Sequence, residues 1–114
     1  MRAKKHLGQN FLNKDTIKEK IVSLLNVEKD DLVIEIGPGR GALTKYLRNL
    51  PCKVLCIEVD TDMKEYLSVY ESDKLSVIYE DVLSFDFSNI NKKKHLCYRK
   101  PPILYYNTYH GAYY

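Results

Sequence analysis

Apolar positions along the chain follow two patterns that alternate. Nearly continuous apolar runs occur at Leu32–Ile36, Lys53–Glu58 and Leu75–Tyr79. Runs of this length are typical of strands that are buried on both faces of a parallel sheet. Apolar residues at helical spacing predict helices over residues 15–26, 41–50 and 62–70. This alternation of strands and helices predicts an α/β fold built on a parallel sheet.

A glycine-rich turn, G-P-G-R-G, directly follows the first apolar run. Gly37, Gly39 and Gly41 let the backbone turn sharply and approach a ligand closely, because they carry no Cβ. The helix that follows begins with free N–H groups that face such a ligand. Glu58 ends the second run, where a carboxylate can accept hydrogen bonds from ribose hydroxyls. The turn and Glu58 together predict a nucleotide-cofactor site in a Rossmann-like half-domain.

The spacing of the glycines leaves the cofactor open. Gly37, Gly39 and Ala42 also satisfy the dinucleotide pattern G-x-G-x-x-G/A, so both S-adenosylmethionine and NAD fit. A turn with a purely structural role is a third alternative. Asp81 follows the third run, beyond the carboxyl end of a strand, where ligands of such sheets collect. Taken alone, Asp81 also fits a helix cap or a solvated loop carboxylate.

Three separately placed motifs narrow the choice. They are K-K-H-L-G-Q-N-F-L at residues 4–12, E-I-G-P-G-R-G-A-L-T at residues 35–44 and I-E-V-D at residues 57–60. Together they resemble the rRNA adenine N6,N6-dimethyltransferases, over roughly residues 3–90. The H-L-G-Q-N-F-L form is more similar to the bacterial enzymes that dimethylate two adjacent adenines near the 3′ end of small-subunit rRNA than to the antibiotic-resistance enzymes acting on large-subunit rRNA. The resemblance implies an incomplete Rossmann-like methyltransferase fold with a parallel sheet of three to four strands.

The resemblance also implies a cofactor, S-adenosyl-L-methionine, and six residues that bind it. They are Asn10, Leu12, Gly37, Gly39, Glu58 and Asp81. The first two would contact the cofactor from the N-terminal segment, and Gly37 would lie under its methionine part. Glu58 would hold the ribose, and Asp81 would bind the adenine amino group.

The pattern of the family breaks after Asn91, where lysines and then tyrosines dominate. In this family a fourth strand ends in the catalytic motif N-L-P-Y, which holds the target amino group in line with the methyl group while an aromatic ring stacks on the flipped adenine. The chain contains no such motif, so no catalytic residue is assigned. We therefore predict that residues 1–91 are the N-terminal part of a cofactor-binding methyltransferase domain and residues 92–114 a non-family tail, with the sheet ending at or just after the third strand.

Out-of-frame translation would explain this tail. Permitted codons for residues 97–114, read one base later, give V-I-G-N-L-P-Y-Y-I-T-T-P-I-M-A-L-I, which contains a strand, the missing motif and the start of a helix in family order. One base inserted into a run of adenines that encodes Lys92, Lys93 and Lys94 would produce the shift. The hypothesis is a truncated family member that ends in non-native sequence.

The function implied by the resemblance is S-adenosylmethionine-dependent dimethylation of adenine N6 in small-subunit rRNA, with this truncated chain expected to be inactive. A non-catalytic cofactor-binding or RNA-binding fragment is the main alternative, and an NAD-binding half-domain is another. The expected partner is small-subunit rRNA or a pre-ribosomal particle. Basic residues near the N-terminus, where RNA phosphates could meet them, are Arg2, Lys4, Lys5, Lys14, Lys18 and Lys20.

Composition places further limits on the protein. The net charge of +3 is mild, and 114 residues suffice for at most one domain. Cys52, Cys56 and Cys97 form neither a paired framework nor a metal-binding spacing, so we expect reduced thiols in the cytoplasm and no metal. No apolar stretch approaches the ~20 residues that span a membrane. We expect a cytoplasmic monomer that is independent of membranes.

Overall fold

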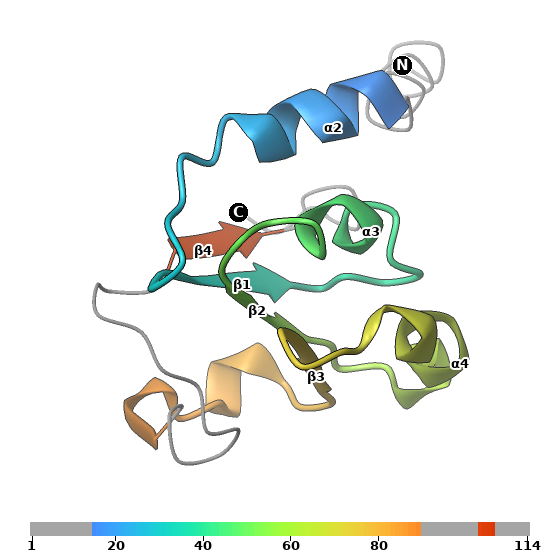
Figure 1. Ribbon diagram of the computed structural model, residues 1–114. Helices are drawn as coiled ribbons and strands as arrows, with labels where there is room; N and C mark the ends of the chain where they lie inside the picture. The colour runs from blue at the N-terminus through green and yellow to red at the C-terminus, as the bar shows by residue number, and fades with distance from the viewer. Residues whose placement is uncertain (1–14, 90–102, 107–114) are drawn as a thin grey trace, which may run out of the picture.

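The computed structural model describes residues 15–89 and 103–106, which form an α/β structure around a four-stranded parallel sheet (Figure 1). The strands are β1 (Leu32–Ile36), β2 (Lys53–Ile57), β3 (Leu75–Ile78) and β4 (Ile103–Tyr106). Their order in the sheet is β3-β2-β1-β4, and every neighbouring pair is parallel. The parallel sheet and the first three strands confirm the fold class expected from the apolar runs.

The helical segments are shorter than the sequence pattern predicts. The α-helices are α2 (Asp15–Ser23), α3 (Thr44–Leu47) and α4 (Lys64–Leu67). The 3-10 turns are η1 (Thr61–Met63), η2 (Ser68–Tyr70), η3 (Val82–Ser84) and η4 (Phe87–Asn89). The helix expected over residues 62–70 is therefore three short consecutive turns, η1, α4 and η2. None of the described helices is long and apolar enough to cross a membrane.

Both faces of the sheet are covered by apolar side chains, which explains the continuous apolar runs. Alternate residues of a strand point to opposite faces, so Val33 and Val54 pack with Leu47 of α3 and Leu67 of α4. Residues on the other face of the strands pack beneath η3; this cluster contains Leu32, Ile34, Leu55, Ile57, Ile78 and Phe85. Figure 1 shows α2 lying beyond α3, on the side of α3 away from β1. Val22 of α2 packs in the cluster that contains Leu47 and Leu67.

The sheet has four strands, within the range of three to four that the resemblance implies, but it continues beyond the third strand, where we expected it to end. Ile103–Tyr106 lies beside β1 as β4, with Val33 opposite Ile103 and Ile36 opposite Tyr106. The segment falls within the predicted non-family tail, yet it pairs with the free edge of β1. That edge presents backbone N–H and C=O groups that require partners, and Ile103 adds a partly buried side chain to the core. The segment lacks the N-L-P-Y motif, so its sequence does not mark it as the fourth strand of the family.

Candidate cofactor-binding site

The glycine turn begins where β1 ends, and its backbone takes conformations that other residues rarely adopt. Gly37, Gly39 and Gly41 have φ angles of +74°, +60° and +92°. The N–H of Gly37 donates to the carbonyl of Ile57 at 2.9 Å, which fixes the start of the turn to β2. Among the residues that the structure describes, no heavy atom lies within 4 Å of a Cβ built at Gly37. The turn is thus anchored to the sheet while the space next to Gly37 is open.

Glu58 joins the end of β2 to this turn. It is only 6% exposed, and its Oε1 accepts a hydrogen bond from the backbone N–H of Gly39 at 2.8 Å. Its Oε2 accepts from the N–H of Asp60 at 3.0 Å. A carboxylate offers about four acceptor positions, so each oxygen retains capacity for a hydroxyl donor. Glu58 therefore shapes the turn and can still accept hydrogen bonds from a ligand.

Asp81 lies beyond the end of β3, at the same edge of the sheet. The N–H of Glu58 donates to the carbonyl of Ile78 at 2.9 Å, so the ends of β2 and β3 are adjacent. The Oδ1 atom of Asp81 accepts from the N–H of Leu83 at 3.0 Å and caps η3. The cap considered from sequence is therefore real, and Asp81 is exposed to any ligand at this edge.

The structure brings together three of the six predicted cofactor residues, Gly37, Gly39 and Glu58, with Asp81 following at the same edge. The other two, Asn10 and Leu12, lie outside the described residues. The carboxyl ends of β1, β2 and β3 thus form one candidate site. Within residues 15–89 and 103–106, no group of His, Cys, Asp or Glu is arranged to hold a metal ion.

Comparisons with known proteins identify the family to which the chain belongs. The model of the family described as ribosomal RNA adenine dimethylase matches residues 1–102. The chain belongs to this family. Among the relatives, the ribosomal RNA small subunit methyltransferase A of Mesoplasma florum is 47% identical over 93 residues, which cover 81% of this chain and 35% of that protein. The protein of the same name from Coxiella burnetii (strain RSA 493 / Nine Mile phase I) is 41% identical over 98 residues, covering 84% of this chain and 38% of that protein.

Solved structures agree with the membership in the ribosomal RNA adenine dimethylase family. A dimethyladenosine transferase from Plasmodium falciparum matches with a TM-score of 0.55 and 29% identity, covering 66% of this chain and 29% of that chain. The 23S rRNA methyltransferase ErmE matches with a TM-score of 0.54 and 26% identity, covering 64% and 31%. The glycopeptide N-methyltransferase MtfA, solved with S-adenosyl-L-methionine, shares the fold at a TM-score of 0.53 and 19% identity, covering 68% of this chain and 37% of that chain. The predicted resemblance and the incomplete Rossmann-like methyltransferase fold are confirmed, and the chain spans about a third of the length of the curated relatives it matches.

Two exposed apolar residues at this edge are not among the cofactor residues predicted from the sequence. Val59 directly follows Glu58 and is 68% exposed, and Leu83 lies two residues after Asp81 and is 91% exposed. Apolar side chains placed beside polar acceptors can cover the planar ring of a ligand. Their positions could have indicated them, because each lies within two residues of an acidic residue at the end of a strand.

Glu35 is the first residue of the family motif at residues 35–44, and the structure shows what its side chain contacts. Its side chain is fully buried, and Oε1 accepts hydrogen bonds from Thr44 Oγ1 at 2.7 Å and Cys56 Sγ at 3.7 Å. Thr44 is the first residue of α3, so Glu35 joins the start of that helix to β1 and β2. Burial, and then the nearby Glu35, raise the pKa of the Cys56 thiol well above its ordinary value. A carboxylate inside an apolar strand was the signal that could have identified this contact.

Proposed function

We propose that the described residues form the S-adenosylmethionine site of an enzyme that dimethylates adenine N6 in small-subunit rRNA, and that this chain is its N-terminal part. The family and its relatives support the reaction and the substrate. The observation that carries the cofactor assignment is the hydrogen bond from Gly39 to Glu58, which sets an anchored glycine turn beside a carboxylate with spare acceptor capacity. A structural neighbour that was solved with the same cofactor supports it further.

Each part of the cofactor has a suitable partner at this edge. The open space next to Gly37 suits the methionine part, and the remaining acceptor positions of Glu58 suit the ribose hydroxyls. The exposed side chains of Val59 and Leu83 suit the faces of the adenine ring, and Asp81 its amino group. We propose that Asn10 and Leu12 add contacts from the N-terminal segment. When bound, the cofactor supplies the methyl group that is transferred.

Methyl transfer requires more than this site. The lone pair of an adenine N6 is delocalised into the ring, so the base must be extruded and the nitrogen held in line with the methyl group. The motif that does this in the family, N-L-P-Y, is absent from the sequence. We therefore propose that the chain binds the cofactor without transferring the methyl group, and that residues 92–114 are an out-of-frame tail.

Titration calorimetry with S-adenosylmethionine tests the cofactor assignment. Replacing Glu58 by Ala removes the ribose acceptor and the partner of the Gly39 N–H, and we expect a loss of about 1–3 kcal/mol in binding free energy. Asp62→Ala is the matched control, because it removes an exposed carboxylate from η1 at the same edge. Equal affinities of the unmodified chain and Glu58→Ala would reject the role of Glu58. Selective binding of NAD in place of S-adenosylmethionine would reject the whole assignment.

A further inference from the structure

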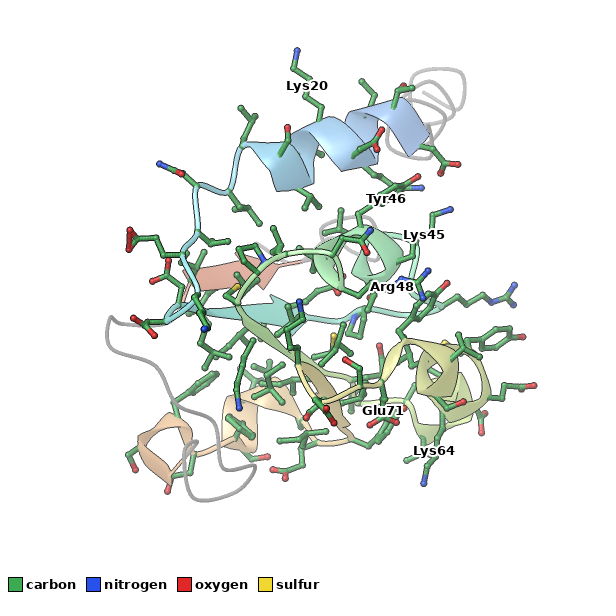
Figure 2. All side chains as sticks on the ribbon, in the orientation of Figure 1. Lys20, Lys45, Tyr46, Arg48, Lys64 and Glu71 are labelled. Carbon is green, nitrogen blue, oxygen red and sulfur yellow. The ribbon has the colours of Figure 1, made fainter. Side chains whose placement is uncertain are left out.

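Two arginines on the α3 side of the molecule are stacked on two tyrosines on the α4 side. The guanidinium carbon of Arg40, in the glycine turn, lies 4.8 Å from the ring centroid of Tyr66 in α4. That of Arg48, which caps the end of α3, lies 5.1 Å from the ring centroid of Tyr70 in η2. We refer to these four residues as the arginine–tyrosine ridge. Figure 2 labels Arg48 where it lies between α3 and α4.

Within the part of the chain that the structure describes, no carboxylate neutralises the positive charge of the ridge. Arg40 and Arg48 are exposed, and within residues 15–89 and 103–106 neither has a carboxylate partner. Lys45, by contrast, forms an ion pair with Asp15 at 3.4 Å. Stacking on an aromatic ring attracts a guanidinium group but leaves its charge intact and its N–H edges free. Both arginines are thus available to an anionic ligand.

The ridge is also held in place by the core. The ring of Tyr70 is half-buried and packs against the hydrophobic cluster that contains Leu67. A Cβ at Gly41 would come within 2.5 Å of Tyr70 Cε2, so the ring lies directly on the glycine turn. Because the ring under Arg48 is fixed, less side-chain entropy is lost when the guanidinium binds a ligand.

We propose that the arginine–tyrosine ridge binds the phosphate backbone of the substrate RNA. The inference rests on the proposed function, because one end of the ridge, Arg40, lies between Gly39 and Gly41 of the cofactor turn. The planar fork of a guanidinium group matches two phosphate oxygens, and a stacked arginine presents that fork outward. RNA that lies along the ridge would therefore reach the edge of the sheet where the proposed cofactor site lies. The ridge positions the RNA and takes no part in the transfer.

Fluorescence anisotropy with a labelled hairpin from the 3′ end of small-subunit rRNA tests the ridge in the 114-residue chain. We expect the double variant R40Q/R48Q to bind roughly tenfold more weakly at moderate salt, and the slope of log affinity against log salt to fall by about 1.4–1.8 because two phosphate contacts are lost. The control K29Q/K53Q removes the same charge beside the amino ends of β1 and β2. It should weaken binding by less than about twofold.

Two further measurements separate the ridge from the cofactor site and from misfolding. R40K/R48K keeps both charges, so it should keep most of the salt dependence even where bidentate geometry is lost. Affinity for S-adenosylmethionine should be the same in R48Q as in the unmodified chain, because Arg48 lies at the end of α3 and outside the glycine turn. An equal loss of RNA binding in K29Q/K53Q, or unchanged RNA binding in R40Q/R48Q, would overturn the proposal. A loss of cofactor affinity in R48Q that matched its loss of RNA affinity would also overturn it. Failure of Glu58→Ala to change cofactor affinity concerns the proposed function alone.

Discussion

The two neighbours of β1 show that pairing in the sheet and building the site have different requirements. β2 and β4 both run parallel to β1, and each pairs with it through at least four residues. β2 continues into Glu58, which fixes the glycine turn, whereas β4 comes from residues 103–106, beyond the part of the chain that matches the family model. A short apolar run with backbone hydrogen-bonding groups is enough to become a strand. The site needs particular side chains at particular positions.

The strongest test of this contrast is enzymatic activity. We expect no detectable methylation of small-subunit rRNA or its precursor particles by the 114-residue chain, because the groups that hold the target adenine are absent. Removing one base within the codons for Lys92, Lys93 and Lys94 should restore the downstream frame and recover dimethyladenine, measured by mass spectrometry of digested rRNA. Methyl transfer by the short chain at a rate near that of the restored protein would contradict the prediction.

Stability should also differ between the inside of the sheet and the β4 edge. Leu55 in β2 is fully buried, so Leu55→Ala should lower the free energy of unfolding by about 2–5 kcal/mol. Ile103 in β4 is only partly buried, and Ile103→Ala should cost about 1–2 kcal/mol. Urea unfolding with linear extrapolation measures both values. A cost at Ile103 equal to that at Leu55 would show that β4 belongs to the core as fully as β2.

The glycine turn provides a comparison within the site. Gly41→Ala should cost about 2–3 kcal/mol, because it adds a Cβ at a φ of +92° and forces that Cβ to within 2.5 Å of Tyr70. Gly37→Ala is the matched control: the φ of +74° is similarly unfavourable, but the space around it is open, so we expect about 1–2 kcal/mol. Thermal unfolding of both variants checks the difference. Equal costs would mean that Tyr70 moves aside easily.

The smallest effect concerns the contact of α2 with α3. A hydrogen bond from Tyr46, and then the charge of Lys45, hold the pKa of Asp15 below its ordinary value of 3.8. A lowered folded-state pKa stabilises the protein above the unfolded-state pKa, and this contribution is lost as the pH falls through the folded-state pKa. The melting temperatures of the unmodified chain and Asp15→Asn should therefore differ slightly at neutral pH and converge once the pH falls below the folded-state pKa of Asp15. A difference that persists in acid would exclude ionisation of Asp15 as its cause.

The sequence was sufficient for the features that depend on local pattern. The apolar runs of β1, β2 and β3 are visible because both faces of each strand are buried, and the glycines at positive φ are visible because few other residues adopt that conformation. The motifs around Gly37 and Glu58 also identified the family correctly. These features are encoded within a few residues, so one sequence reveals them.

Contacts between segments that are distant in the sequence could not be predicted from local patterns. The stacking of Arg48 on Tyr70 depends on how the end of α3 meets η2, which no spacing within either segment predicts. The position of β4 depends on the vacant edge of β1 rather than on any motif in residues 103–106. The helix expected over residues 62–70 was predicted as one element because periodicity cannot distinguish an α-helix from consecutive 3-10 turns.

The two buried cysteines at and just before β2, Cys52 and Cys56, give the protein a built-in pair of chemical reporters. Cys52 lies just before the start of the strand and Cys56 near its end, and both are 1% exposed or less. Burial raises the pKa of each thiol, which keeps both in the unreactive protonated form. A thiol reagent can therefore reach either sulfur only when its own end of β2 opens. Because Cys56 contacts Glu35 beneath the glycine turn, the labelling rates of the two thiols distinguish opening of the cofactor edge from opening of the opposite edge of the same sheet.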